Sequence, residues 1–306
     1  MPNLTRVGIV GTGWVGSSVA ISTLHAGVAQ ELLLHDARTS VAEGEAMDLA
    51  HGAAFYPVAA VRAVSLDEMR TTDAVVIAAG RGGRPGESRL DLARDNVRLV
   101  REIAGHFRGY SGILLVVTNP VDVLTHEVAM SSGLPFERVI GTGTMLDTAR
   151  LRQMVGGTLG LAPQSIHAQV VGEHGDSEVV LWSSARAAGV PLRNWEGWTA
   201  EKETTVAAQV RTAAYEIIQR KGATNHAIGL VTATLLKAVL RGENRALTVS
   251  RVQDGALGIE DLALSLPAIV GAGGASTVII PELSQAEREQ LERSAAVLRQ
   301  AIGSLA

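Results

Sequence analysis

Three groups of residues carry side chains that could bind an anion and move a proton. The most prominent is His174, which lies between two glycines and is flanked by two carboxylates in the segment Gly172–Asp176. A carboxylate partner can tune the charge of a histidine near neutral pH, which suits a general acid or base. An isolated histidine is more often structural, so the segment alone leaves both interpretations open.

Asp147 and Arg150 form the second group. They are three residues apart in a predicted helix, Leu146–Val155, and therefore share one face of it. The simpler interpretation is an ion pair between the two side chains. In the functional alternative, Asp147 orients a histidine and Arg150 holds a substrate carboxylate in a bidentate fork.

The third group is a loop at residues 81–89, which contains three arginines and four residues that are glycine or proline. The loop is basic and its composition permits many backbone conformations. It fits either a solvated surface loop or a lid that closes an arginine over an anionic substrate.

A glycine-rich segment near the N-terminus indicates a dinucleotide site. Gly11–Gly16 has the pattern G-x-G-x-x-G, follows a predicted strand at Val7–Val10 and opens a predicted helix at Val15–Leu24. Asp36 ends the second predicted strand, 20 positions after the last glycine of the pattern. The strand, turn, helix and acidic residue together are what the motif requires, whereas the glycines alone would fit other α/β turns.

Each residue of this motif has a physical task. Gly11 permits the tight turn, Gly13 lets the backbone approach a pyrophosphate, and Gly16 lets the helix pack closely against the strand. The N-terminus of the helix attracts the anion. Asp36 would accept hydrogen bonds from a ribose hydroxyl and repel a 2′-phosphate, so the motif predicts NAD rather than NADP.

The wider pattern predicts two domains. Residues 1–141 alternate predicted strands and helices, which indicates an α/β fold with a doubly wound parallel sheet of the Rossmann type. Residues 142–306 have a different pattern, which predicts an α+β domain for substrate binding and catalysis. The predicted strands are Val7–Val10, Glu31–His35, Ala74–Ala78, Ile113–Val117 and Arg138–Gly141, with apolar runs at Ala168–Val171, Leu247–Val249 and Leu262–Ile280. The predicted helices are Val15–Leu24, Val41–Ala50, Leu90–Phe107, Leu146–Val155, Thr199–Arg220, Ala227–Leu240 and Ser284–Ala301, the last opened by a capping box of Ser284 and Glu287.

The composition excludes several classes of protein. The 306 residues are 46% hydrophobic and 19% charged, which is typical of a folded globule rather than a disordered chain. The net charge of −4 leaves no basic footprint for nucleic acid, and the absence of cysteine excludes disulfides and a cysteine nucleophile. No apolar run reaches the roughly 18 residues of a membrane span, and the N-terminus lacks a signal-peptide pattern, so we expect a soluble cytoplasmic protein.

With these residues in view, the chain resembles the L-lactate/malate dehydrogenase family, and more closely its lactate dehydrogenase branch, essentially from end to end. Together the motifs that carry the resemblance are highly specific. They are Gly11–Gly16, Glu87–Leu92, Val117–Asp122, Gly141–Arg150, Gly172–Glu178 and Lys221–Thr224.

The resemblance implies a role for each matching residue. His174 would donate and accept the proton, Asp147 would orient it, and Arg150 would bind the substrate carboxylate. Arg89 would be the catalytic lid arginine that polarises the substrate carbonyl, with Gly83 and Arg84 beside it in the lid. Asn119 would lie beside the nicotinamide and the reacting oxygen, and Thr224 would line the substrate pocket. The cofactor would contact Gly11, Thr12, Gly13, Trp14, Val15, Gly16, Asp36, Ala79, Gly80, Thr118 and Asn119, and no metal would be needed.

The motifs leave more than one 2-oxo acid open as the substrate. Glu173 and Thr224 favour lactate and pyruvate, but Gly83 occupies the lid position where lactate enzymes typically have glutamine and malate enzymes arginine. The glycine leaves three alternatives: pyruvate with modest discrimination, a bulkier 2-oxo acid, or oxaloacetate paired with Arg84 or Arg81. A non-catalytic NAD-binding redox sensor is the alternative from a different class, and it predicts damage to the catalytic set, which is intact.

Two further residues suggest regulation. Arg152 and His167 match positions that bind fructose 1,6-bisphosphate at a subunit interface of allosteric bacterial lactate dehydrogenases. A cationic pair facing its symmetry mate suits a bisphosphate, so the resemblance implies a homotetramer that this ligand activates. The alternative is that both are ordinary interface or surface residues.

Overall fold

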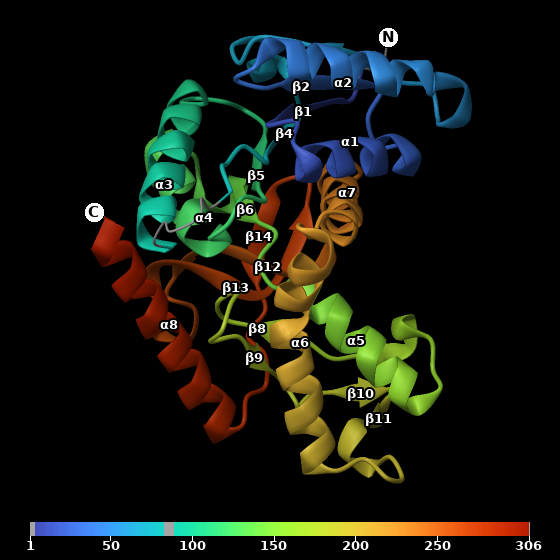
Figure 1. The fold of residues 1–306 in the computed structure, drawn as a ribbon. Helices are drawn as coiled ribbons and strands as arrows, with labels where there is room; N and C mark the ends of the chain where they lie inside the picture. Colours follow the sequence, from blue (N-terminus) through green and yellow to red (C-terminus); the bar gives the residue numbers. More distant parts are fainter. Residues whose placement is uncertain (1–3, 83–88, 306) are drawn as a thin grey trace.

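The fold is built on one mixed sheet that runs through both halves of the chain (Figure 1). The computed structural model describes residues 4–82 and 89–305, with no side-chain description for Arg89. Within these residues, nine strands form the sheet in the order β14-β13-β12-β6-β5-β4-β1-β2-β3. Smaller sheets of three strands (β11-β10-β7) and two strands (β8-β9) accompany it.

The first half contributes six parallel strands in a doubly wound order, which confirms the predicted fold class. All five predicted strands are present, and their apolar, β-branched sequences explain why they are buried at the centre of the sheet. β3 was not predicted because it lies at the edge, and no residue in it is fully buried. The strands are β1 (Arg6–Val10), β2 (Glu31–His35), β3 (Ala60–Ala63), β4 (Ala74–Ile77), β5 (Ile113–Val116) and β6 (Val139–Gly141).

Helices cover both faces of this parallel sheet (Figure 1). Three of the four were predicted, but α4 was not. Nine of its twelve residues are buried, so it lacks the apolar stripe and polar face by which a surface helix is recognised. The helices are α1 (Trp14–Ala26), α2 (Thr39–His51), α3 (Arg89–His106) and α4 (Val121–Ser132).

The second half extends the sheet with three antiparallel strands and adds four helices. β12 joins the parallel part through Ser250, which pairs with Gly141 of β6. The apolar run at residues 262–280 forms two strands joined by a tight turn. The strands are β7 (Ile166–His167), β8 (Val170–Val171), β9 (Val179–Val180), β10 (Arg186–Ala187), β11 (Val190–Pro191), β12 (Arg245–Asp254), β13 (Glu260–Gly271) and β14 (Gly274–Val278). The helices are α5 (Met145–Leu159), α6 (Ala200–Lys221), α7 (His226–Leu240) and α8 (Gln285–Leu305), and single turns of 3-10 helix lie at Ala53–Phe55, Glu68–Thr71, Phe136–Arg138, Pro163–Ser165, Leu192–Asn194 and Ala256–Gly258.

The predicted capping box at the start of α8 is present. The backbone N–H of Ser284 donates to Glu287 at 2.8 Å, and the backbone N–H of Glu287 donates to the Ser284 hydroxyl at 3.4 Å. Glu287 also accepts the backbone N–H of Ser183 at 2.9 Å, which ties α8 to the segment after β9. This contact matters for function because Ser294 of the same helix anchors the loop that carries His174.

Among the helices of residues 4–82 and 89–305, none is long and apolar enough to cross a membrane.

Candidate active site

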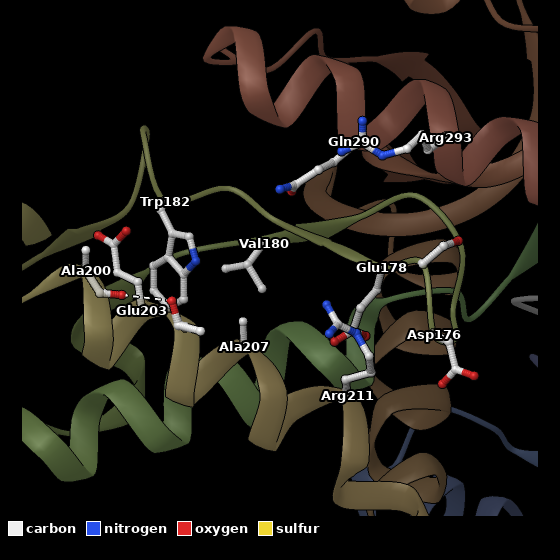
Figure 2. Close-up of a pocket in the computed structure, with 12 residues that line it drawn as sticks. Asp176, Glu178, Val180, Trp182, Ala200, Glu203, Ala207, Arg211, Gln290 and Arg293 are labelled. Atoms are coloured by element: carbon white, nitrogen blue, oxygen red, sulfur yellow. Dashed lines mark hydrogen bonds between the residues drawn. The ribbon is translucent and has the colours of Figure 1, made fainter.

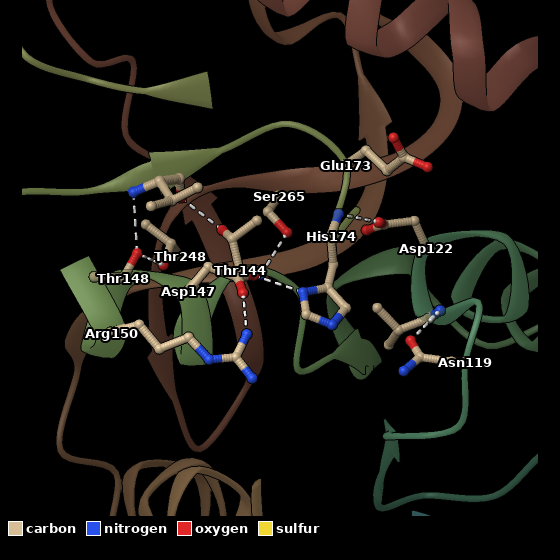
Figure 3. Close-up of polar contacts among 12 residues, drawn as sticks. Asn119, Asp122, Thr144, Asp147, Thr148, Arg150, Glu173, His174, Thr248 and Ser265 are labelled. Carbon is tan, nitrogen blue, oxygen red and sulfur yellow. Dashed lines mark hydrogen bonds and ion pairs between the residues drawn. The ribbon is translucent and has the colours of Figure 1, made fainter. Parts of the chain in front are cut away.

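His174 and Asp147 meet although 27 residues separate them in sequence (Figure 3). His174 lies in the loop after β8, and Asp147 lies in the first turn of α5. The imidazole Nδ1 is 2.5 Å from Asp147 Oδ2, and the side chain of Asp147 is only 3% exposed. His174 is 21% exposed, so its ring can reach a ligand while its partner is shielded from water.

The electrostatics of this pair favour a charged imidazole. Burial by itself lowers the pKa of His174, but the charge and hydrogen bond of Asp147, with the charge of Asp122, raise it to about 9. Burial by itself raises the pKa of Asp147, but the charge and hydrogen bond of His174, with those of Arg150, hold it below its ordinary value. The pair is therefore an imidazolium and a carboxylate at neutral pH.

Arg150 forms the ion pair that its spacing predicts. Its Nη1 donates to Asp147 Oδ1 at 2.7 Å, while the other oxygen of Asp147 faces His174. Asp147 can therefore form an ion pair with Arg150 and orient His174 at the same time, because the two partners contact different oxygens of its carboxylate. The Arg150 side chain is 12% exposed and lies beside the pair in Figure 3.

The loop of His174 is also held by α4 of the first half and by α8 of the second half. The backbone N–H of His174 donates to Asp122 Oδ2 at 2.7 Å, and the backbone N–H of Glu173 donates to Ser294 Oγ at 2.8 Å. The sequence analysis did not single out Asp122 as a site residue, although it ends the Val117–Asp122 motif. That membership was the only signal that could have found it.

The glycine-rich turn has the close approaches that the motif predicts. Gly11 has a φ of +94°, and a Cβ added there would lie 2.5 Å from the backbone nitrogen of Ala79. A Cβ on Gly16 would lie 1.9 Å from the carbonyl oxygen of Gly11, so only glycine fits. Around Gly13, by contrast, an added Cβ would meet no atom within 4 Å, which leaves the open space that a pyrophosphate needs.

Asp36 lies beside this turn. Its carboxylate accepts the backbone N–H groups of Thr12 and Arg38, each at 3.0 Å. Burial alone would raise the pKa of Asp36, but these hydrogen bonds hold it below the ordinary value. A carboxylate oxygen has further lone pairs for a ribose hydroxyl, and a cavity of about 410 Å³ opens next to Asp36.

The remaining predicted cofactor residues gather at the carboxyl ends of β4 and β5. The Thr118 hydroxyl donates to the carbonyl of Ala79 at 2.8 Å, and a Cβ on Gly80 would lie 2.4 Å from the Thr118 methyl group. Asn119 follows and is exposed. Trp14, at the start of α1, is 63% exposed. These residues lie where dinucleotides bind in open α/β sheets, so they fit NAD.

The predicted lid cannot be placed in full. Gly83 and Arg84 lie outside the described residues, and Arg89 begins α3 without a described side chain. Arg81 lies just before the gap, and its guanidinium pairs with Asp95 at 2.5 Å. Thr224 lies half-buried in the turn between α6 and α7.

Arg152 and His167 lie on neighbouring elements, α5 and β7. Arg152 donates through Nε to the carbonyl of Ala168 at 3.1 Å. Burial lowers the pKa of Arg152, and the nearby charge of Arg245 lowers it further. His167 is exposed. Arg152 and Arg245, from α5 and β12, thus lie close enough for their charges to interact.

A second polar cavity, of about 500 Å³, lies on the side of the His174 loop that faces α6 and α8 (Figure 2). Glu178 of this loop lines it, is 5% exposed, and has one carboxylate oxygen without a hydrogen-bond partner. Burial and the charge of Asp147 raise the pKa of Glu178 to about 8, although His174 and Arg211 act against this. The sequence analysis did not predict a buried carboxylate here, because nothing local distinguishes Glu178 from a surface glutamate.

The parallel sheet, the glycine-rich turn and the histidine–carboxylate pair define a dinucleotide-binding enzyme, and comparison with known proteins identifies its family. The lactate/malate dehydrogenase NAD-binding domain matches residues 5–141, and the alpha/beta C-terminal domain of the same family matches residues 144–306. The chain therefore belongs to the lactate/malate dehydrogenase family, in which the N-terminal domain binds NAD, as the sequence predicts.

Individual relatives narrow the comparison. The chain is 44% identical over 302 residues to an L-lactate dehydrogenase of Bacillus caldolyticus, with 96% of this chain and 95% of the relative covered. It is 42% identical over 300 residues to an L-lactate dehydrogenase of Synechococcus sp. (strain JA-3-3Ab), with 97% and 98% covered. The solved structure of the minor L-lactate dehydrogenase of Enterococcus mundtii has a TM-score of 0.96 at 38% identity and covers 99% of both chains.

Proposed function

We propose that the protein is an NAD-dependent L-lactate dehydrogenase that interconverts pyruvate and L-lactate. The observation that carries this proposal is the His174–Asp147 pair, 2.5 Å apart, because it presents a charged imidazole close to the cofactor side of the sheet. The L-lactate dehydrogenases among the relatives support this substrate over oxaloacetate, a bulkier 2-oxo acid or a redox sensor without activity.

His174 is the proton donor of the proposed reaction. Bound NADH supplies a hydride to the carbonyl carbon of the substrate. Negative charge then develops on the carbonyl oxygen, and the His174 imidazolium donates its proton there. Asp147 keeps the ring oriented and stabilises its charged form, since Nδ1 faces this carboxylate and the opposite nitrogen is left for the substrate.

Arginine side chains bind and polarise the substrate in this proposal. Arg150 holds the substrate carboxylate, which sets the face of the carbonyl that meets the cofactor. Arg89 stabilises the developing charge, in a lid that also contains Gly83 and Arg84. Asn119 lies beside the reacting oxygen, and Thr224 lines the pocket for the substrate methyl group.

Replacement of His174 tests the reaction. His174→Gln removes the donor but keeps a polar side chain, so we expect NADH binding, measured by fluorescence, to stay within about twofold. Turnover of pyruvate should fall by at least about 10³-fold, because a general acid contributes roughly 10²–10⁴ and its loss also leaves Asp147 Oδ2 without its charged partner. Retained turnover would refute the acid–base role.

We further propose a cytoplasmic homotetramer with its domains divided near residue 141 and with fructose 1,6-bisphosphate as activator. The support is the charge of Arg245 near Arg152, with His167 exposed on the neighbouring strand β7, because clustered cations suit a bisphosphate across a symmetric interface. Added bisphosphate should lower the half-saturation concentration for pyruvate, and Arg152→Ala should abolish that response. If the half-saturation concentration for pyruvate in the parent enzyme did not change, activation by the bisphosphate would be refuted. The proposed reaction would not be affected.

A further inference from the structure

Asp122 connects the two halves of the chain at His174. It lies in the first turn of α4, in the half that contains the cofactor motif, and its side chain is 2% exposed. Its Oδ2 accepts the backbone N–H of His174 at 2.7 Å across 52 residues of sequence (Figure 3). The backbone of this loop is also anchored from outside by Ser294 on α8 and, at Gly172, by Ser265 on β13.

The charged carboxylate of Asp122 is buried without a full set of hydrogen-bond partners, which is unfavourable if its only role is to accept one hydrogen bond. Its Oδ1 has no hydrogen-bond partner, and the Ser250 hydroxyl, which is near enough to lower the pKa, makes no hydrogen bond of ordinary geometry with it. Burial outweighs Ser250 and the His174 N–H and raises the pKa of Asp122 to about 6. An asparagine would accept the same N–H without burying a charge, so the charge itself calls for an explanation.

The charge of Asp122 acts on the imidazole of His174. Each group favours the charged form of the other: His174 lowers the pKa of Asp122, and Asp122 raises that of His174. The other charged groups around this centre come from α5 and from the histidine loop itself; they are Asp147, Arg150, Glu173 and Glu178. Asp122 is the carboxylate that reaches His174 from the cofactor-binding half.

Asp122 also shares a turn with a residue on the cofactor side. Asn119 lies three residues earlier, and its Oδ1 accepts the backbone N–H of Val121 at 3.2 Å. The residue that follows this turn, Asp122, is the one that accepts the backbone N–H of His174.

We propose that Asp122 is a positioning residue for the proposed hydride-transfer reaction, which holds the His174 backbone in register with the cofactor side and stabilises the charged imidazole. This inference rests on the proposed function. It predicts that the charge of Asp122, and not only its hydrogen bond, matters to the proton affinity of His174.

Asp122→Asn in the full-length enzyme tests this, since asparagine keeps an acceptor oxygen and loses the charge. The proton affinity of His174 is followed by NMR of enzyme with ¹³Cε1-labelled histidine, with the His174 signal assigned by its loss in His174→Gln. We expect the His174 pKa to fall by about one unit, and the descending limb of kcat/KM for pyruvate to move to lower pH with it. Asp67→Asn, at a side chain that is 83% exposed, is the matched control and should move neither.

Stability shows whether the variant keeps the fold. Burial raises the pKa of Asp122 to about 6, so burying its charged form costs folding free energy, and that cost is complete above this pH. The neutral amide should therefore leave Tm at pH 7.5 unchanged or higher. A purely structural acceptor predicts an unmoved His174 pKa, because asparagine keeps the hydrogen bond to the His174 N–H, and that result would overturn the proposal.

Titration of the parent enzyme provides a second test that needs neither the Asp122 variant nor turnover. Protonation of Asp122 should produce a second inflection near pH 6 in the His174 titration. A single inflection would contradict the inference even if Asp122→Asn fails to fold. An enzyme that titrates as predicted but does not reduce pyruvate would instead refute the proposed function.

Discussion

At the scale of single residues, three carboxylates influence one imidazole by different routes. Asp147 contacts the ring, Asp122 holds the backbone, and Glu178 lies on the loop beside a polar cavity. All three belong to motifs that carry the family resemblance, but only Asp147 had a role of its own assigned from the sequence. The pKa of His174 is thus a property of elements that meet only in the folded chain.

The pH dependence of pyruvate reduction follows from this charge balance. Pyruvate requires protonated His174, so kcat/KM should be flat at neutral pH and fall about tenfold per unit above pH about 9. Oxidation of lactate requires the neutral imidazole and should rise over the same range. Steady-state rates at constant ionic strength measure both, and a midpoint near the ordinary histidine value of about 6.5 would contradict the assigned pKa.

At the scale of elements, different glycines of the glycine-rich turn are needed for folding and for cofactor binding. Gly16 is required for packing because its neighbour's carbonyl leaves no room for a side chain, whereas Gly13 borders open space at the N-terminus of α1. The two glycines of one motif therefore serve different ends.

Alanine at each of these glycines tests that separation. Gly13 has a φ of −72°, and a Cβ added there meets no atom within 4 Å, so the Tm of Gly13→Ala should stay within about 2 °C of the parent. Its affinity for NADH should fall about tenfold, because the added methyl group enters the pyrophosphate space. Gly16→Ala should instead lower Tm markedly or prevent folding. Thermal unfolding and fluorescence titration measure both quantities, and a Gly13→Ala enzyme with parental NADH affinity would show that no backbone approach occurs there.

The strands and helices differ in how well they could be predicted from the sequence. Strands with continuous apolar residues, such as β1 and β5, and helices with clear periodicity, such as α3, were predicted close to their observed bounds. The buried helix α4 and the two-residue strands β7 to β11 lack any local period, so their formation depends on tertiary packing. The meeting of His174 with Asp147 followed from family resemblance, because spacing alone cannot bring residues 27 positions apart together.

At the scale of the whole molecule, the site depends on the sheet being continuous. β12 pairs with β6, and the Thr148 and Thr248 hydroxyls lie 3.0 Å apart, which fixes α5 to the extended sheet. The half that binds the cofactor and the half that carries His174 are therefore parts of one packed unit. In the proposed function, substrate choice is made where these two halves meet.

The most direct test of the proposed function is the steady-state oxidation of NADH with pyruvate, oxaloacetate and 4-methyl-2-oxopentanoate. We predict that kcat/KM for pyruvate exceeds that for oxaloacetate at least tenfold, a difference of about 1.4 kcal/mol in transition-state binding. Pyruvate should also exceed the branched substrate. A higher kcat/KM for oxaloacetate would contradict the proposal and indicate a malate dehydrogenase, and a preference for the branched acid would mean that Gly83 has made room for a larger side chain.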